Sequence, residues 1–361
     1  MGFKSDPIYK TWYPFVLTDE AMTHAMIFFL ATVLDQSYHK VVSTDWRTHA
    51  DQATRLISER LSSEKLATAD ASIAAVIVLA TAEFIAGNLD AFDVHMDGVA
   101  RMVELRGGLT ALESYPFLKR KIRQVDVTRA VLRVSQPRFP LVESRRLRPP
   151  LNTFYSDPEP TCGQGIFQLT QQHSILCNLI EVFGDMYELI TAITSSQGEG
   201  NPHIDPIFFL DSTSSILHRL TTSFAPIGYG KDYVHLYECC RLGTLLFTRG
   251  ISEQSVWPPQ TRIALFDHVK ESLRPHIKEE CAWMNLKLWT LFMAGVTATG
   301  LPQRTWFTAQ AANITLKLDI RNWEDIRVLL KQFWWLPKLQ EWLCKDFWED
   351  IVNLREVLSA L

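Results

Sequence analysis

The sequence predicts an all-α protein, a multi-helical domain of about ten to thirteen helices. Apolar residues recur at helical spacing along most of the chain, and no convincing run alternates apolar and polar residues as a half-buried strand would. Proline and glycine gather in a few short stretches between these periodic segments. Apolar residues make up 47% of the 361 residues and charged residues 21%, which is typical of a globular domain with a buried core.

The first part of the chain predicts an N-terminal extension over residues 1–17 and a helical domain over 18–361. Thr18, Asp19 and Glu20 suit a helix N-terminus, because the free N–H groups there attract negative charge. The run 71–87 is the most apolar, but it is short for a membrane span and contains Glu83, so it predicts a buried core helix and no membrane insertion. The expected helices here cover 18–38, 46–61, 68–87, 91–106 and 116–134.

A proline-rich stretch over 135–165 predicts a long irregular connection. It holds six prolines and two glycines in thirty-one residues, and proline both removes a backbone donor and breaks helices. This stretch is the best candidate for an internal domain boundary, although such a loop can also lie over one domain. Helical periodicity then predicts helices over 165–195, 203–224, 231–250, 259–276, 279–299 and 302–318, and two more separated by Pro337.

Charge is uneven along the chain. The net charge is -4, but 119–148 contains ten basic residues against two acidic ones, which is +8 and leaves -12 elsewhere. Two interpretations stay open: a solvated helix and loop, or a contact for an acidic partner or nucleic acid. Within this run, Arg145, Arg146 and Arg148 are the candidate contact residues.

Motifs of common enzymes and of cofactor sites are not found, so no cofactor and no metal site is expected. The six cysteines are scattered without a C-x-x-C pair, which favours reduced thiols in the nucleus or cytoplasm. His235 and Cys239 lie four residues apart on a predicted helix and could form a base and a nucleophile. The alternative is that Cys239 is a small buried apolar residue.

The segment 95–109 carries the densest pattern in the chain. On a helix over 91–106, His95, Gly98 and Met102 share one face, and Gly98 would let the helix over 71–87 approach closely. The following Gly107 and Gly108 are suited to the left-handed conformation that ends a helix. The pattern therefore favours a helix and its stop signal.

Arg106, in the last turn of that helix, would complement the helix dipole. His95 is open to two interpretations, a half-buried side chain bonded to a nearby carbonyl or a catalytic group. His95 and Arg106 therefore stay among the catalytic candidates.

This segment, His95-Met96-x-Gly98-x-x-x-Met102-Val103-x-x-Arg106-Gly107-Gly108-Leu109, resembles the fungal-specific transcription factor domain, the helical regulatory module that usually follows a binuclear zinc cluster. Residues 286–307 are similar to a later helix of that family and carry Trp289 and the Arg-x-Trp-Phe sequence that includes Trp306. The tryptophan-rich end, from Trp323 onward, is similar too. The resemblance covers roughly residues 20 to 350.

The resemblance implies transcriptional control in the nucleus. The six closely spaced cysteines of the zinc cluster are not found in this sequence, so no direct sequence-specific DNA binding is expected. The chain would then act through a protein partner, either a DNA-binding zinc cluster factor or a second copy of itself. A small metabolite bound between helices is a further expectation.

Two alternatives stay open. The helical domain could have been repurposed, with a cytoplasmic location, as an enzyme or ligand-binding protein in fungal specialised metabolism, although an enzyme is the less favoured interpretation. Its candidate residues are His95, Arg106, His235 and Cys239. Alternatively, a zinc cluster could be encoded upstream of this sequence.

Overall fold

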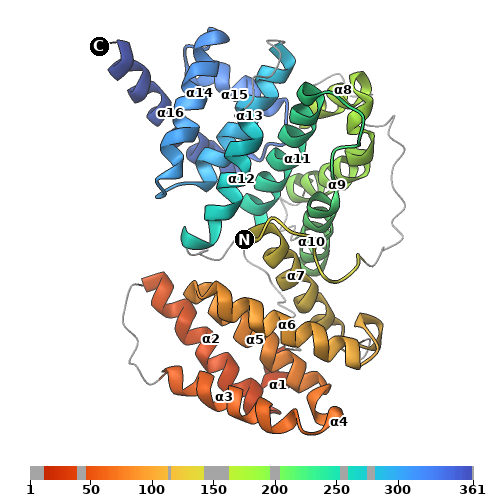
Figure 1. Cartoon of the computed structure of the whole chain (residues 1–361). Coiled ribbons are helices and arrows are strands. Elements are labelled where there is room, and N and C mark those ends of the chain that lie inside the picture. The colour runs from red at the N-terminus through yellow and green to blue at the C-terminus, as the bar shows by residue number, and fades with distance from the viewer. Residues whose placement is uncertain are drawn as a thin grey trace. The chain divides into compact units, whose positions relative to one another are not determined.

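The computed structural model describes residues 12–38, 46–112, 115–141, 162–195, 204–252, 259–274 and 281–359. Within these ranges the chain forms sixteen α-helices and no strands (Figure 1). The all-α prediction is confirmed, but ten to thirteen helices was too few. Two four-residue helices, α1 (Tyr13–Val16) and α4 (Glu64–Ala67), carry too little periodicity to be recognised, and the helix expected over 165–195 is broken.

The chain divides into two compact units, each of which is described separately. The N-terminal unit comprises Met1–Pro140, Asp205–Ser214 and Gln254–Ile263, and the C-terminal unit comprises the rest. The division after Pro140 falls inside the proline-rich stretch. The domain limits expected from the sequence, 1–17 and 18–361, remain a prediction.

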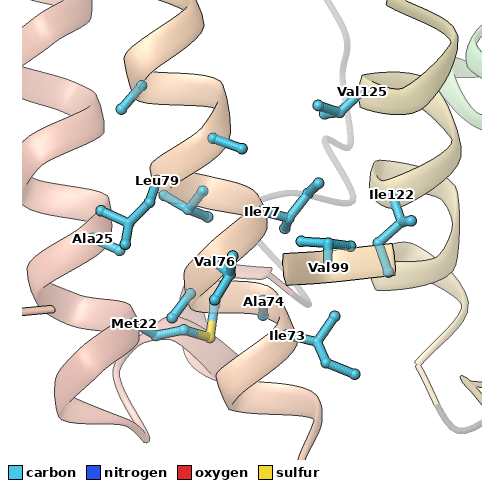
Figure 2. Packing of buried hydrophobic residues seen from close by; sticks show 14 of the residues in the cluster. Met22, Ala25, Ile73, Ala74, Val76, Ile77, Leu79, Val99, Ile122 and Val125 are labelled. Atoms are coloured by element: carbon cyan, nitrogen blue, oxygen red, sulfur yellow. The ribbon is translucent and has the colours of Figure 1, made fainter. Parts of the chain in front are cut away.

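The N-terminal unit is built around α5, the helix with the most apolar sequence. Thirteen of its residues are buried, most of them small or aliphatic. Its neighbours α2 and α6 pack against it, and Figure 2 shows Met22 and Ala25 of α2 beside Val76 and Leu79 of α5. The helices of this unit are α1, α2 (Glu20–Tyr38), α3 (Trp46–Arg60), α4, α5 (Asp70–Ala86), α6 (Leu89–Leu105), α7 (Pro116–Leu132) and the first part of α10 (Pro206–Thr222).

The expected packing of α6 on α5 is present, but Gly98 is not needed for it. A Cβ atom at Gly98 would lie 3.9 Å from Cγ1 of Val76, which is an ordinary van der Waals distance. The small and aliphatic side chains of α5 therefore set the approach of the two helices. None of the described helices has the length and apolar character needed to cross a membrane.

The C-terminal unit has an aromatic core. Trp289 of α13 is fully buried, stacks on Phe333 with ring centroids 5.3 Å apart, and donates from Nε1 to the carbonyl oxygen of Trp334 at 3.3 Å. The helices of this unit are α8 (Gln164–Gln172), α9 (Ile180–Ser195), the last part of α10, α11 (Lys231–Ser252), α12 (Ile263–Leu273), α13 (Cys281–Thr297), α14 (Gln303–Lys317), α15 (Trp323–Lys331) and α16 (Pro337–Ser359).

Two glycines make room for rings of this core. A Cβ atom at Gly243 of α11 would lie 2.2 Å from Cζ3 of Trp289, and one at Gly295 of α13 would lie 2.2 Å from Cζ of Phe347. Real Cβ atoms do not come so close to another atom. Each ring therefore packs directly on the backbone of a neighbouring helix, and any larger residue at either glycine would displace it.

Candidate functional site

The family-like segment 95–109 folds as α6 followed by a tight helix stop. Gly107 and Gly108 have backbone φ angles of +97° and +92°, which residues with a Cβ atom rarely adopt. The N–H of Gly108 donates to the carbonyl of Val103 at 2.8 Å, and the N–H of Gly107 to that of Glu104 at 3.0 Å. These two bonds are those of a Schellman motif, which satisfies the last carbonyls of the helix.

Arg106, the C-cap of α6, links that helix end to the beginning of α5. Its Nη1 lies 2.6 Å from the carbonyl oxygen of Thr68 and 2.7 Å from Oδ1 of Asp70. The side chains of Arg106 and Asp70 are only 22% and 18% exposed. The guanidinium therefore pairs with a carboxylate of its own unit, an arrangement that fits a structural clamp better than an anion-binding site.

His95 lies half-buried on α6. Burial lowers its pKa below the ordinary 6.5, and the carboxylate of Glu83 on α5 opposes part of that shift. The imidazole is consequently neutral at pH 7. Among the described residues, no hydrogen bond or ion pair joins His95 to Arg106, so these two candidates do not form a common site.

His235 and Cys239 of α11 do not form an activated pair. Cys239 is fully buried, and burial raises the pKa of its thiol to about 12. The reactive form of a cysteine is the thiolate, and this thiol stays protonated at neutral pH. Burial lowers the pKa of His235 as well, and no hydrogen bond connects the two side chains in the described part of the chain. A catalytic role for the pair gains no support from this geometry.

Four of the seven described basic residues in the basic run are held in internal ion pairs. Arg120 of α7 meets Asp211 of α10 at 3.1 Å, and Arg129 meets Asp93 of α6 at 2.7 Å. Two further pairs in the same unit join Arg133 to Asp93 and Arg138 to Asp97. Partly exposed pairs of this kind each contribute about 0–1 kcal/mol, so they mainly position α6 and α10 against α7 and the residues after it. The candidate contact residues Arg145, Arg146 and Arg148 lie outside the described residues.

The tryptophans singled out in the sequence differ in their surroundings. Trp289 belongs to the core of the C-terminal unit, as described above. Trp306 of α14 is half-buried and meets Phe307 edge to face, with centroids 5.3 Å apart. Trp323 is half-buried at the first position of α15. These surroundings fit packing roles for the family-like positions, as does the burial of Met102 in the core of the N-terminal unit.

The arginine of the Arg-x-Trp-Phe sequence has a clear partner set that the sequence did not reveal. Arg304 of α14 reaches α16, where its Nε lies 2.6 Å from Oδ2 of Asp350 and its Nη2 lies 2.7 Å from Oδ2 of Asp346. Its guanidinium also lies over the ring of Phe347, 5.3 Å from the centroid. Arg304 therefore fastens α14 to α16. The acidic residues four apart on α16 were the signal that could have indicated it.

A buried polar network beside Cys239 was also missed. Arg241 of α11 is buried, pairs with Glu238 at 2.6 Å, and donates to the carbonyl of Leu220 at 2.9 Å. Its Nη2 lies 3.3 Å from Nε2 of His268 on α12. Since arginine only donates, Nε2 of His268 must accept and the ring is neutral. Burial first, and then Arg241, lowers the pKa of His268.

Among the described residues, no group of three or more His, Cys, Asp or Glu side chains is placed so that it could hold a metal ion. The candidate catalytic residues thus remain scattered, while the segments that resemble a family are helix stops, interhelical clamps and core aromatics. Such an assembly defines a helical module whose recognisable sequence features maintain its fold.

The comparison with protein families identifies that module. The family described as the fungal specific transcription factor domain matches residues 3–359, nearly the whole chain. The chain therefore belongs to this family, and no zinc cluster domain was detected in it. Searches of curated proteins and of solved structures gave no match.

Proposed function

We propose that this chain regulates transcription in the nucleus through contacts with a protein partner. The observation that carries the proposal is the family match over residues 3–359, which spans both compact units. The internal pairing of Arg106 and the burial of Cys239 support it, because both fit packing roles for these two candidate catalytic residues. The partner is either a DNA-binding zinc cluster factor, which would bring the chain to DNA, or a second copy of this chain.

Sensing of a small metabolite is the finer part of this proposal. Clefts between helices are common ligand sites in helical proteins, and an interhelical cleft is where such a metabolite would bind. The regulatory role does not depend on this step.

A tethered reporter tests the regulatory role. Residues 1–361 are fused to an unrelated DNA-binding domain, and transcription of a reporter carrying its operator is measured in fungal cells. The proposal predicts a change of at least threefold, up or down, relative to the DNA-binding domain alone. A stable, soluble fusion that leaves the reporter at its basal level would contradict it.

Two variants control for folding in that assay. Gly98→Ala places a Cβ at an ordinary contact distance and should leave the reporter response intact. Gly243→Leu would push Trp289 out of its place in the core, and the reporter response should then be lost.

Chromatin immunoprecipitation tests how the chain reaches DNA. We expect the chain to occupy defined promoters in cells, whereas the purified chain should not bind those promoters by itself.

A further inference from the structure

Two histidines face each other between α2 and α3 of the N-terminal unit. Nδ1 of His24 lies 2.7 Å from Nδ1 of His49, and the ring centroids are 4.9 Å apart. In a hydrogen bond between two such nitrogens, one must carry a proton and the other must accept it. Each Nδ1 is thus directed at the other, and removal of the proton between them would leave two nitrogen lone pairs that converge on one point.

This separation is close to the one that two histidine ligands of a single metal ion require. Zinc binds imidazole nitrogen at about 2.0–2.1 Å. Two such bonds place the nitrogens about 3.3 Å apart at a tetrahedral angle and about 2.9 Å apart at a right angle. The observed distance of 2.7 Å is shorter by only about 0.2–0.6 Å. Because the terminal torsion of a histidine side chain is soft, small ring rotations would make room for an ion.

The backbone on either side of the pair is anchored in the core. Phe28, one turn after His24, stacks on Trp46, which lies one turn before His49, with ring centroids 5.3 Å apart. Ala53, one turn after His49, is fully buried. These anchors fix the spacing of α2 and α3 beside the two rings. The two nitrogens are therefore brought together by the fold itself, which is what a preorganised ligand pair requires.

The surroundings of the pair are suited to a cation. Both rings are half-buried, so part of each ring is in contact with water and an ion can reach them. At the described positions one turn before and after His24 and His49 there is no lysine or arginine. Glu20 lies four residues before His24 on the same side of α2. Its carboxylate would attract a positive ion to the pair.

We propose that His24 and His49 together bind one divalent transition-metal ion of the zinc, nickel and copper class. Imidazole nitrogen suits these ions, whereas magnesium and calcium prefer oxygen. On binding, the shared proton moves through solvent to Nε2 of its own ring, and both Nδ1 lone pairs face the ion. Water fills the remaining positions. The ion would fasten α2 to α3, a property that goes beyond the proposed role in transcription.

The small number of protein ligands sets the expected affinity. The usual zinc site has three or four protein ligands, and the described residues hold no group of three or more that could bind a metal. A pair supplies about half of the ligands of a structural zinc site and about half of its binding free energy. The corresponding dissociation constant is about 1–200 µM.

Isothermal titration calorimetry of the purified full chain with zinc chloride tests the site. One saturable site per chain is expected, and His24→Gln and His49→Gln should each weaken it at least tenfold. His95→Gln is the matched control and should bind as the unmodified chain does. All titrations use a Cys177→Ser background, because this thiol is exposed and can bind zinc by itself. No binding, or binding that either glutamine variant retains, overturns the proposal.

Thermal unfolding measures whether the ion fastens the two helices. Zinc at about ten times its dissociation constant should raise the unfolding midpoint by about 2 °C, because it binds the folded chain only. Each variant is compared with itself in the presence and absence of zinc, which removes any effect of the lost hydrogen bond. The rise should be missing in His49→Gln and in magnesium chloride. An equal rise in either case contradicts a histidine-held ion.

X-ray absorption at the zinc edge identifies the ligands directly. In the unmodified chain, the spectrum should show two imidazole nitrogens at about 2.0–2.1 Å, with oxygen in the remaining positions. Sulfur at about 2.3 Å would place the ion on a cysteine. Dominant sulfur ligation, or a shell of oxygen alone, would rule out the proposed site.

Discussion

The two units of this chain solve the problem of close helix packing differently. In the N-terminal unit, α5 buries alanine, valine, isoleucine and leucine along most of its length, and α2 and α6 pack against these small surfaces. In the C-terminal unit, large rings such as Trp289 and Phe347 pack directly on backbone at Gly243 and Gly295. In the N-terminal unit, small side chains along the whole of α5 allow close packing. In the C-terminal unit, single glycines provide the room that each ring needs.

This difference predicts opposite responses to the same change. Adding a methyl group at the helical Gly98 of the N-terminal unit should be tolerated, whereas adding it at Gly243 should not. Cores packed close to the density of organic crystals tolerate extra volume only where neighbours can move. A tryptophan held between two helices has little room to do so.

The largest expected effect is that of Gly243→Ala. The new Cβ would lie 2.2 Å from Cζ3 of Trp289 and 2.8 Å from Oγ1 of Thr290, so the free energy of unfolding should fall by about 3 kcal/mol. Denaturant unfolding measures this. Repeating the substitution in a Trp289→Ala background sharpens the test, because the cost should shrink once the ring is removed. A cost that is the same in both backgrounds would mean that the ring is not what the glycine accommodates.

A smaller loss is expected from Arg106→Ala in the N-terminal unit. The change removes the contacts with Thr68 and Asp70 that join the end of α6 to the start of α5. Charged hydrogen bonds of this kind are worth about 1.5–3 kcal/mol, and a loss of about 1.5 kcal/mol is expected because both side chains are partly exposed. Arg101→Ala, which removes an exposed pair with Glu104 on the same helix, is the matched control and should cost much less. Equal losses would contradict the clamp.

Gly98→Ala should stabilise the chain by about 0.5–1 kcal/mol. Alanine is the better helix former, and its Cβ would meet Val76 at 3.9 Å without strain. Thermal unfolding of this variant beside Gly243→Ala compares the two units directly. A destabilised Gly98→Ala variant would show that the α5–α6 approach needs this glycine after all.

The smallest effect is a pH dependence at His95. Its pKa is lowered by burial, so between that lowered value and 6.5 the unfolded chain binds more protons than the folded chain. Stability should therefore fall as the pH drops through this window, and rise again with pH. His95→Gln should reduce the fall, as measured by urea unfolding at several pH values on either side of 6.5. An identical pH profile in the variant would show that His95 is not desolvated.

Local sequence signals predicted the elements that depend on local interactions. The apolar run and Glu83 indicated the buried helix α5, the glycine pair indicated the stop of α6, and Pro337 indicated the start of α16. In each case the residue types themselves favour the observed backbone.

Features set by distant contacts were not predictable in the same way. The helix expected over 165–195 is broken at His173, which has an extended backbone although neither glycine nor proline is nearby. Nε2 of His173 accepts a hydrogen bond from Nε1 of Trp283, 110 residues further along the chain. From the local sequence, Gly243 is only a residue that weakens a helix. The position of Trp289, 46 residues further along the chain, explains why a glycine is needed there. Likewise, the four-residue spacing from His235 made a catalytic role for Cys239 conceivable. Burial, which the sequence does not show, raises the pKa of the thiol and keeps it protonated.

The measurement that most directly tests the regulatory role is deletion of the gene in its source organism, with transcripts and small metabolites quantified in the same cultures. The account predicts that defined sets of transcripts change, and that a plasmid copy carrying Cys239→Ala restores them, because burial keeps this thiol in its unreactive protonated form. If transcripts stay constant while one product disappears and its precursor accumulates, the chain acts as an enzyme and the regulatory account is wrong.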